Sequence, residues 1–412
     1  MKIAFLTLGC KLNYAETSTY ERGFARAGLE VVPKTARADI YLVNTCSVTA
    51  TSDSKSRNLI RKVHRLNPDA AIIVTGCSAE LRRAEIERIE GVTLVFGAAE
   101  KQYVVSRTLA LFGIACPQEP SSFFSAYSTG ERTRSFLKVQ DGCNNYCRYC
   151  TVPYARGESR NAPICECVRN ARSIAAEGVK EIVLTGVNTG DFGRTTGESF
   201  LDLLKALDEV EGISRYRISS IEPNLLTEDI IDWIASETKF QPHFHIPLQT
   251  GCDELLEAMG RKYHTAFFRD KIEYIRRALE GPGKSRVFFG IDVMVGLPGE
   301  TQEMFLRTRS FIESIAPAFI HVFPYSRRPG TPAFSMPGQV PEEVKAQRVA
   351  SLEELCSRLH SDFVESNRGV AETVLFESAN RGGLMEGYTG NYIRVSRPFD
   401  KSLVNELVDV IL

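Results

Sequence analysis

Three cysteines lie in one short segment at a spacing that suits a metal cluster. Cys143, Cys147 and Cys150 occupy positions i, i+4 and i+7, directly after a short apolar run that predicts a strand. Three thiolates at this spacing can ligate three irons of a cubane 4Fe–4S cluster and leave the fourth iron open. An open iron can be chelated by the amino and carboxylate groups of S-adenosylmethionine. A reduced cluster can then cleave the sulfonium bond to give an adenosyl radical.

A zinc site is the alternative for this segment. Tetrahedral zinc usually shows paired Cys-x2-Cys motifs, or one such pair together with histidines. No second pair and no nearby histidine accompanies Cys143 to Cys150. The spacing therefore favours an iron-sulfur cluster.

Three further cysteines share a position in the fold rather than a segment. Predicted strands end in Thr-Leu-Gly-Cys10, Val-Asn-Thr-Cys46 and Val-Thr-Gly-Cys77. The carboxyl ends of parallel strands share one edge of a sheet, so these thiols can converge despite their separation in sequence. The alternative is three buried structural cysteines, since free cysteine is among the most buried residue types. The other five cysteines are expected to be structural: Cys116, Cys165, Cys167, Cys252 and Cys356.

The elements that must position Cys10, Cys46 and Cys77 form an α/β pattern. Short aliphatic runs alternate with amphipathic helical stretches up to about Cys116, as a parallel sheet requires. The predicted strands are Lys2 to Leu8, Ile40 to Asn44, Ala71 to Thr75 and Val92 to Phe96. Residues 1–118 are therefore predicted to form one domain, followed by a polar linker over residues 119–134.

Strand-helix alternation resumes after the linker and continues for about six units, which predicts a partial (β/α)6 barrel over residues 135–368. The carboxyl ends of its strands would carry the site. The predicted strands are Ser135 to Val139, Glu181 to Leu184, Arg215 to Ser219, His243 to Pro247, Val287 to Val295 and Phe319 to Phe323. Thr301 is expected to cap the last of the intervening helices.

The end of the chain has a different composition. After a long charged helix, residues 369–412 contain short strands separated by glycine turns, which predicts a small antiparallel β-barrel. Four aromatic and polar residues there are typical of RNA contacts: Tyr388, Asn391, Tyr392 and Arg394. Basic residues also cluster at Arg57, Arg61, Lys62 and Arg65, and at Arg327 and Arg328. A solvated helix face explains each basic cluster equally well.

The composition bounds the protein class. A chain of 412 residues is longer than one hydrophobic core usually serves. Its 50 Lys plus Arg are balanced by 51 Asp plus Glu, which excludes a strongly basic nucleic-acid binder. Neither a secretory signal nor a run of about 20 apolar residues is present, so we expect a cytoplasmic protein without membrane contact. Eleven cysteines in a reducing compartment indicate metal binding rather than disulfides.

The motifs together resemble the radical S-adenosylmethionine superfamily, whose Cys-x3-Cys-x-aromatic-Cys signature occurs here with Tyr149 as the aromatic residue. More narrowly, the chain is similar to the methylthiotransferases over essentially its whole length. The segments that carry this resemblance include Thr7-Leu-Gly-Cys-Lys-Leu-Asn13, Val43-Asn-Thr-Cys-Ser-Val48, Val152-Pro-Tyr-Ala-Arg-Gly157, Ser220-Ile-Glu-Pro223, His245-Ile-Pro-Leu-Gln249 and Asp292-Val-Met-Val-Gly-Leu-Pro-Gly-Glu300.

The resemblance implies two 4Fe–4S clusters and a carboxyl-terminal RNA-binding domain of the TRAM type. Cys10, Cys46 and Cys77 would bind the cluster that donates sulfur. S-adenosylmethionine would be used twice, once for the methyl group and once for the radical that activates the base carbon. The implied cofactor contacts are Tyr149, Arg160, Thr185, Gly186, Asn188, Ser220, Glu222, Gln249 and Val295. Strand-end polar groups at a barrel rim are equally often structural.

Substrates differ within this family. Thr7-Leu-Gly-Cys-Lys-Leu-Asn13 and Gly390-Asn-Tyr-Ile-Arg-Val395 are most similar to the enzymes that act on N6-threonylcarbamoyladenosine at position 37, next to the tRNA anticodon. The resemblance then implies a monomer that binds the anticodon stem-loop and receives electrons from a flavodoxin or ferredoxin. Isopentenyladenosine in tRNA and an aspartate of a ribosomal protein are the alternative substrates. A radical enzyme for another protein or small molecule, and a non-enzymatic cluster scaffold, are alternatives of a different class.

Overall fold

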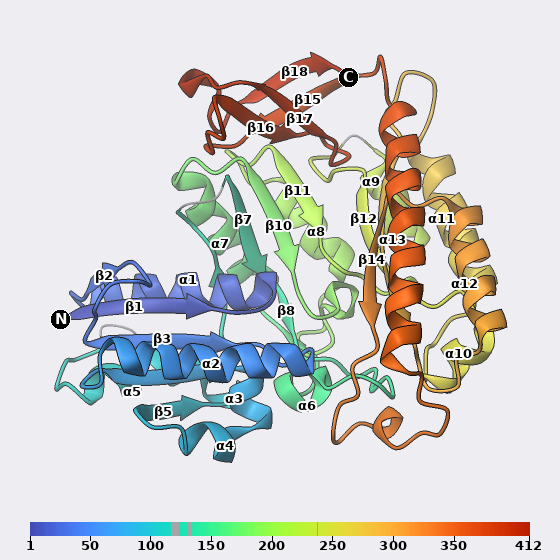
Figure 1. The fold of residues 1–412 in the computed structure, drawn as a ribbon. Coiled ribbons are helices and arrows are strands. Elements are labelled where there is room, and N and C mark those ends of the chain that lie inside the picture. The colour runs from blue at the N-terminus through green and yellow to red at the C-terminus, as the bar shows by residue number, and fades with distance from the viewer. Residues whose placement is uncertain (117–122, 131–132, 237) are drawn as a thin grey trace.

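The computed structural model describes residues 1–116, 123–130, 133–236 and 238–412 (Figure 1). Its first part is the predicted parallel sheet, in the order β2-β1-β3-β4-β5. The strands are β1 (Lys2–Thr7), β2 (Glu30–Val32), β3 (Ile40–Thr45), β4 (Ala71–Gly76) and β5 (Val92–Phe96). The sequence pattern did not predict β2, because three partly exposed residues at a sheet edge leave no period to detect.

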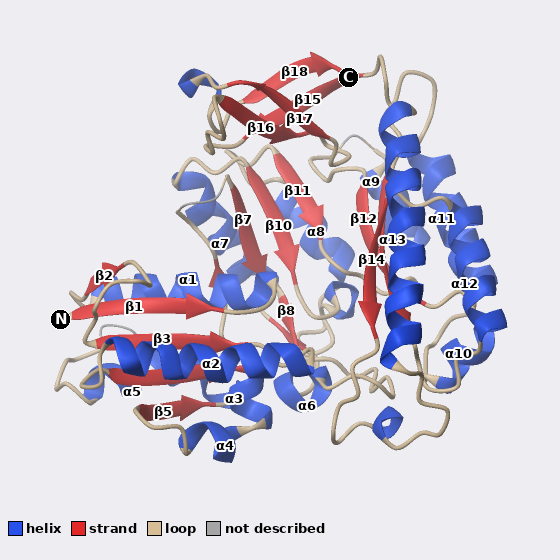
Figure 2. Cartoon of the chain, viewed as in Figure 1, coloured by secondary structure: helices blue, strands red, loops and turns tan. Residues whose placement is uncertain are grey.

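Helices cover both faces of this sheet (Figure 2). Residues of α1 (Lys11–Arg26) and α5 (Val104–Ala110) pack on one face, and those of α2 (Ala50–Leu66), α3 (Cys77–Leu81) and α4 (Arg83–Glu87) pack on the other. The short helix η1 (Ala98–Tyr103) precedes α5. Because both faces are buried, β3 is buried along its whole length, as central parallel strands usually are.

The second part confirms the predicted partial barrel. Its six parallel strands are β7 (Arg134–Lys138), β10 (Glu181–Thr185), β11 (Arg215–Ile218), β12 (His243–Gln249), β13 (Phe288–Val295) and β14 (Phe319–Pro324). They form two sheets, β11-β10-β7-β6 and β12-β13-β14, which meet at a parallel bridge between Tyr216 and Phe240. The strand β6 (Ala126–Tyr127) lies in the predicted linker and pairs antiparallel to β7. Residues 117–122 and 131–132 of that linker lie outside the described residues.

Helices cover the outer side of the barrel strands, where the largest hydrophobic core lies (Figure 2). They are α7 (Ile164–Ala176), α8 (Phe200–Asp208), α9 (Glu228–Ile234), α10 (Asp253–Ala258), α11 (Thr265–Leu279), α12 (Gln302–Ile315) and α13 (Glu342–Glu365). Thr301 caps α12 as predicted, because its side chain accepts a hydrogen bond from the Met304 amide. Short elements connect the rest: β8 (Gln140–Asp141), α6 (Val152–Arg156), β9 (Arg160–Asn161), η2 (Thr189–Asp191) and η3 (Pro332–Phe334).

The sequence predicts a small antiparallel β-barrel for the tail, and the structure has a curled antiparallel sheet there. Its strands are β15 (Ala371–Phe376), β16 (Leu384–Tyr388), β17 (Arg394–Pro398) and β18 (Leu407–Ile411), with η4 (Lys401–Leu403) before the last one. The order β17-β16-β15-β18 makes a curled sheet with β17 and β18 as its edges. Figure 1 shows this sheet at the end of the barrel where the strands begin, opposite the loops at their carboxyl ends.

Candidate active site with two cysteine triads

The structure brings the three amino-terminal cysteines together, as their strand-end positions predict. Cys10 precedes α1, Cys46 follows β3, and Cys77 begins α3. Gly9 lies against Cys46, since a methyl group built on Gly9 would stand 3.1 Å from the Cys46 Sγ. The thiols of Cys10 and Cys77 both influence the pKa of Cys46, so all three lie in one electrostatic neighbourhood.

Burial shapes the acidity of this triad. Desolvation raises the pKa of the Cys46 and Cys77 thiols, and the cations of Arg156 and Lys101 oppose that rise at Cys77. Buried thiols of this kind are deprotonated when a metal replaces the proton, because the thiolate is the ligand form. Nearby cations then offset part of the negative charge of a bound cluster.

The second triad lies in the loop between β8 and α6. Gly142, which precedes it, has φ +75°, and a Cβ there would stand 2.0 Å from the Glu158 carbonyl oxygen. Only glycine therefore fits at this position. Each sulfur accepts one N–H donor: the Asn145 amide to Cys143 (3.5 Å), the Val152 amide to Cys150 (3.4 Å), and the Arg261 Nη1 to Cys147 (3.1 Å). Burial raises the pKa of Cys143, and that of Cys150 to about 12.

Both triads fit a cluster better than a single ion. Among the described residues, neither triad brings its three sulfurs within 4.8 Å of one another. A zinc ion draws its ligand sulfurs to about 2.3 Å from the metal, so it would need a tighter group. Three N–H donors aimed at three sulfurs suit thiolates that carry the charge of an iron-sulfur cluster.

Arg261 links the second triad to a predicted cofactor contact, and no motif in the sequence indicates it. Its guanidinium is buried, donates to Cys147, lies 3.4 Å from the Tyr149 hydroxyl and forms an ion pair with Glu222. The neighbouring Tyr149 and Tyr263 hydroxyl groups and the Glu222 carboxylate more than offset burial and hold the pKa of Arg261 well above its usual value. Arg261 therefore remains a cation beside the cysteines.

Gln140 is a second residue that the sequence analysis missed. Its Oε1 accepts from the amides of Val187 and Asn188, both at 2.9 Å. Its Nε2 donates to the Gly142 carbonyl at 2.7 Å and to the Ser159 hydroxyl at 3.0 Å. One buried amide therefore joins the turn after β10 to the cysteine loop.

The predicted cofactor residues lie around this connection. Gly186 packs against the Gln140 side chain, and the Asn188 Oδ1 accepts from the Glu222 amide at 3.4 Å. Thr185 is buried and donates to the Val183 carbonyl at 3.1 Å, so its hydroxyl is used within its own strand. These contacts place the carboxyl end of β10 beside the second triad.

The remaining predicted residues are more spread out. Arg160 pairs with Asp141 at 3.3 Å, and Ser220 lies 3.5 Å from the His245 Nδ1. Gln249 ends β12 at a register shift with φ +68°. Val295 ends β13, buried, and its carbonyl accepts from the Tyr325 amide at 2.8 Å. All four lie at or near the carboxyl half of the barrel strands, and their contact with a cofactor stays a prediction.

A buried charge cluster lies between the two triads. Glu16 on α1 accepts from Lys101 (2.8 Å), Lys138 (2.9 Å) and Arg156 (3.2 Å), and Asp141 accepts from Lys138 (2.7 Å) and Arg156 (2.9 Å). Burial by itself would raise the pKa of both carboxyls, but the surrounding cations outweigh it and lower them. Arg156 ends α6, which packs on α3. The helix after Cys150 thus contacts the helix that begins at Cys77.

An ion pair between Arg328 and Asp53 connects the barrel to the amino-terminal part of the chain. Arg328 is buried and donates to Asp53 at 2.6 Å and to Ser47 at 2.8 Å. It belongs to the interior, so the predicted basic patch at Arg327 and Arg328 is wrong for Arg328. Arg327 is exposed.

The tail residues predicted to stack on RNA contact the barrel instead. Asn391 is completely buried and donates to Asn367 at 2.9 Å. The Tyr392 hydroxyl accepts from Arg134 at 2.9 Å, and its ring lies tilted beside that of His243. Arg134 also lies 4.7 Å from the centre of the Tyr388 ring. These three residues therefore hold the tail on the barrel, whereas Arg394 is exposed.

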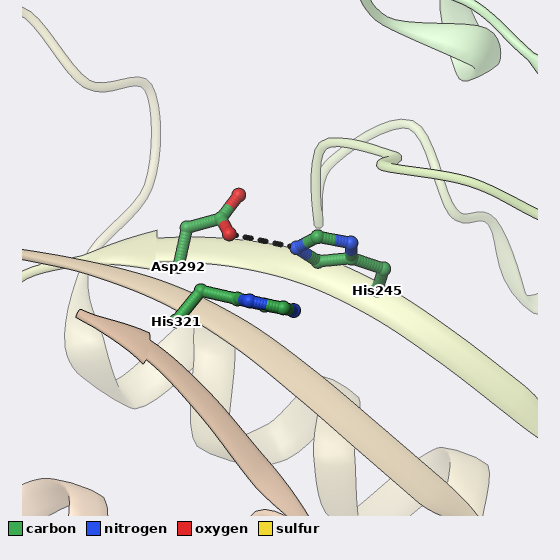
Figure 3. Close-up of side chains that lie close together, drawn as sticks. All are labelled: His245, Asp292 and His321. Atoms are coloured by element: carbon green, nitrogen blue, oxygen red, sulfur yellow. Dashed lines mark hydrogen bonds and ion pairs between the residues drawn. The ribbon is translucent and has the colours of Figure 1, made fainter. Parts of the chain in front are cut away.

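Polar residues line the inner side of β12, β13 and β14. His245 Nε2 lies 2.8 Å from the Asp292 carboxylate, and the His321 ring stacks beside His245 at a centroid distance of 5.0 Å (Figure 3). Burial lowers the pKa of the Lys11 ammonium, and the carboxylate of Asp292 acts in the opposite direction. Lys11 follows Cys10 directly, so a residue next to the first triad interacts electrostatically with this inner side.

Comparison with known proteins agrees with this geometry. Residues 2–97 match the uncharacterized protein family UPF0004, and residues 137–312 match the radical SAM superfamily. The threonylcarbamoyladenosine tRNA methylthiotransferase MtaB of Bacillus subtilis is 37% identical over 99% of this chain and 93% of its own length. The protein of that name in Aquifex aeolicus is 35% identical over the whole of both chains. The tRNA-2-methylthio-N(6)-dimethylallyladenosine synthase of Carboxydothermus hydrogenoformans is 30% identical over 91% of this chain and 88% of its own.

Solved structures share the fold at low identity. The radical S-adenosylmethionine methyltransferase TsrM from Kitasatospora setae, solved with cobalamin and a [4Fe-4S] cluster, covers 81% of this chain and 77% of its own at a TM-score of 0.59 and 16% identity. The cobalamin-dependent enzyme OxsB aligns over 87% of this chain and 56% of its own, with a TM-score of 0.52.

Among the described residues, no helix combines the length and apolar character needed to cross a bilayer.

Proposed function

The chain belongs to the radical S-adenosylmethionine methylthiotransferase family, and from this premise we propose that it converts N6-threonylcarbamoyladenosine at position 37 of tRNA to its 2-methylthio derivative. Relatives of that named activity cover nearly the whole chain at 35–37% identity. The enzyme uses S-adenosylmethionine and 4Fe–4S clusters, as its superfamily does. We assign one cluster to each cysteine triad.

The observation that carries this proposal is the pairing of two open triads on adjoining loops. Cys143, Cys147 and Cys150 would hold the cluster that binds S-adenosylmethionine, and Cys10, Cys46 and Cys77 would hold the sulfur-donating cluster. A reduced cluster of the first kind supplies an adenosyl radical, which can activate a base C–H bond that acid-base groups cannot deprotonate. Three thiolates leave one iron free in each cluster for a reactant.

The residues around the triads hold these parts in place. Gln140 fixes the cysteine loop against the turn after β10, and Arg261 keeps a positive charge at Cys147 and orients Glu222. Cys46, Cys77 and Cys147 are buried, which limits the access of water to that side of each proposed cluster. Gly186, Asn188, Ser220 and Glu222 are the proposed contacts to the cofactor on this side.

The other predicted contacts extend the same proposal. We assign Tyr149, Arg160, Thr185, Gln249 and Val295 to the rim of the cofactor site. We propose that its partners are the tRNA anticodon stem-loop and, as electron donor, a flavodoxin or ferredoxin. We also propose that the protein acts as a monomer in the cytoplasm. Dimethylallyladenosine in tRNA is the second candidate substrate, because relatives of that name are 30% identical to this chain.

The test uses anaerobically reconstituted protein, tRNA containing threonylcarbamoyladenosine, S-adenosylmethionine and a reductant. We expect about eight irons per chain, and mass spectrometry of the digested tRNA should show the 2-methylthio nucleoside. Cys147→Ala should reduce iron to about four per chain and abolish 5′-deoxyadenosine formation. Cys46→Ala should also reduce iron but retain 5′-deoxyadenosine formation without thiolation.

Cys165→Ala serves as the matched control, because Cys165 is exposed on α7 and belongs to neither triad. It should keep full iron content and full thiolation. Thiolation by the Cys46→Ala protein would contradict the donor-cluster assignment. Thiolation of dimethylallyladenosine tRNA alone would contradict the proposed substrate.

A further inference from the structure

The inner side of the barrel carries an unpaired cation next to the proposed sulfur donor. Lys11 follows Cys10 at the start of α1, and it keeps contact with solvent although the surrounding protein lowers the pKa of its ammonium. It makes no hydrogen bond and no ion pair with any residue in the described part of the chain. The neighbouring guanidiniums of Arg134 and Arg217, by contrast, are bound to Glu377 and Glu181.

Three charged or polar side chains point to the inner side of the barrel, and two of them, Asp292 and His321, interact electrostatically with Lys11. Alternate residues of the strands point in opposite directions, and Ile246, Ile291 and Ile320 point into the core beneath the helices. His245, Asp292 and His321 therefore point inward, where Lys11 influences the pKa of His321 and the carboxylate of Asp292 influences that of Lys11. His321 is exposed, and its ring nitrogens have no hydrogen-bond partner among the residues that the structure describes.

A single metal ion suits this group of side chains less well than an anion does. The His245 and His321 rings are stacked with an interplanar angle of 26°, so their nitrogen lone pairs do not converge on one point. Asp292 already accepts from His245, as Figure 3 shows. The positive charge of Lys11, which already lowers the pKa of His321, would also repel a cation. An anion, in contrast, finds a free ammonium and imidazole N–H donors here.

We propose that Lys11, together with His321, binds the carboxylate of the threonylcarbamoyl group on the substrate adenosine. This inference rests on the proposed function. The reacting C2 and the substituted C6 flank N1 of adenine, so both lie on one edge of the base. A carboxylate held at Lys11 would therefore keep C2 on the side of the Cys10, Cys46 and Cys77 triad.

The same group explains discrimination between the two candidate substrates. A threonylcarbamoyl group brings a carboxylate, a hydroxyl and amide-like groups that can satisfy Lys11 and His321. A dimethylallyl group is a hydrocarbon, which would remove water from the ammonium without replacing its hydrogen bonds. Desolvating a charge without a partner is costly, so the inner side of this barrel disfavours the hydrocarbon.

The experiment compares three anticodon stem-loops that differ only at position 37, which carries threonylcarbamoyladenosine, its neutral methyl ester or dimethylallyladenosine. Fluorescence anisotropy with cluster-loaded protein should show the acid bound about tenfold more tightly than the ester, as expected for one charge-assisted contact. Lys11→Met should remove this difference, and His321→Phe should reduce it. Lys205→Met, exposed on α8, should retain it.

Iron content and cluster absorbance of each variant establish that Lys11→Met still carries both clusters. If that loaded variant keeps the preference for the acid over the ester, the inference is wrong. A wild-type preference that vanishes on removal of divalent ions also overturns it, in favour of a metal at His245, Asp292 and His321. If wild-type protein thiolates no threonylcarbamoyladenosine RNA, the proposed function fails, whatever the binding assay shows.

Discussion

At the scale of single residues, the cluster loops are controlled by a few donors that are not ligands. The Arg261 guanidinium contacts the Cys147 sulfur and also forms the ion pair with Glu222. Hydrogen bonds to cluster sulfurs make a reduction potential more positive, because they stabilise the more negative reduced state. Arg261 is therefore expected to tune the cluster as well as position Glu222.

Replacing Arg261 with glutamine should make the midpoint potential of the cluster at Cys143, Cys147 and Cys150 more negative. The rate of 5′-deoxyadenosine formation should fall about tenfold, the equivalent of one lost charge-assisted hydrogen bond. Redox titration followed by electron paramagnetic resonance measures the first effect, and chromatography measures the second. Arg172→Gln, exposed on α7, should change neither. An unchanged potential in Arg261→Gln would show that Arg261 has no influence on the cluster.

At the scale of elements, Gln140 connects β8 and the cysteine loop to the turn after β10. Its amide oxygen accepts two backbone N–H groups and its amide nitrogen donates to the Gly142 carbonyl. Backbone groups that lose such a buried partner cost about 1–3 kcal/mol each. The relative position of the two loops therefore depends on this one side chain.

Gln140→Leu should weaken S-adenosylmethionine binding about tenfold and lower the unfolding midpoint, because the buried amides of Val187 and Asn188 lose their acceptor. Isothermal titration with loaded protein measures the affinity. Gln302→Leu, at the exposed start of α12, is the control and should behave like wild type. Unchanged affinity in Gln140→Leu would mean that the turn after β10 takes no part in cofactor binding.

Part of the candidate site can be predicted from the sequence through the elements that position it. Cysteines at strand ends predict a common site because parallel strands align their ends, and the structure brings Cys10, Cys46 and Cys77 together. Gln140 and Arg261 follow no local pattern, because their partners are set by packing between segments far apart in sequence. His245, Asp292 and His321 come from three strands, so no spacing along the chain reveals them. Tyr392 and Asn391 match an RNA-binding composition, but composition does not tell which face they occupy.

At the scale of the whole molecule, the sheet and barrel are joined through buried charges. Glu16 and Asp141 form ion pairs with Lys101, Lys138 and Arg156, which come from both parts of the chain. Removing one member of such a group leaves the others uncompensated, which costs about 3–5 kcal/mol. The distance between the triads is thereby fixed by electrostatics as well as by hydrophobic packing.

Glu16→Gln should lower the urea midpoint of the loaded protein strongly at pH 7. The pKa of both carboxyls is lowered in the fold, so their stabilisation is complete above the unfolded value of about 4 and is lost as pH falls below it. Wild-type stability from this cluster should therefore be constant from pH 8 to about pH 5 and decline below about pH 4. Glu16→Gln should show a smaller acid decline, while Glu343→Gln, exposed on α13, should follow wild type. An equal acid decline in both variants would exclude Glu16 as a source of the pH dependence.

Besides the side-chain contacts of Asn391 and Tyr392, hydrogen bonds to the main chain of the tail attach it to the barrel. Arg215 donates to the carbonyls of Tyr388 and Thr373, and Arg217 donates to those of Thr389 and Gly390. Carbonyl oxygens are present whatever side chain a residue carries. Exposed positions such as Arg394 can therefore be exchanged while the joint between tail and barrel keeps these bonds.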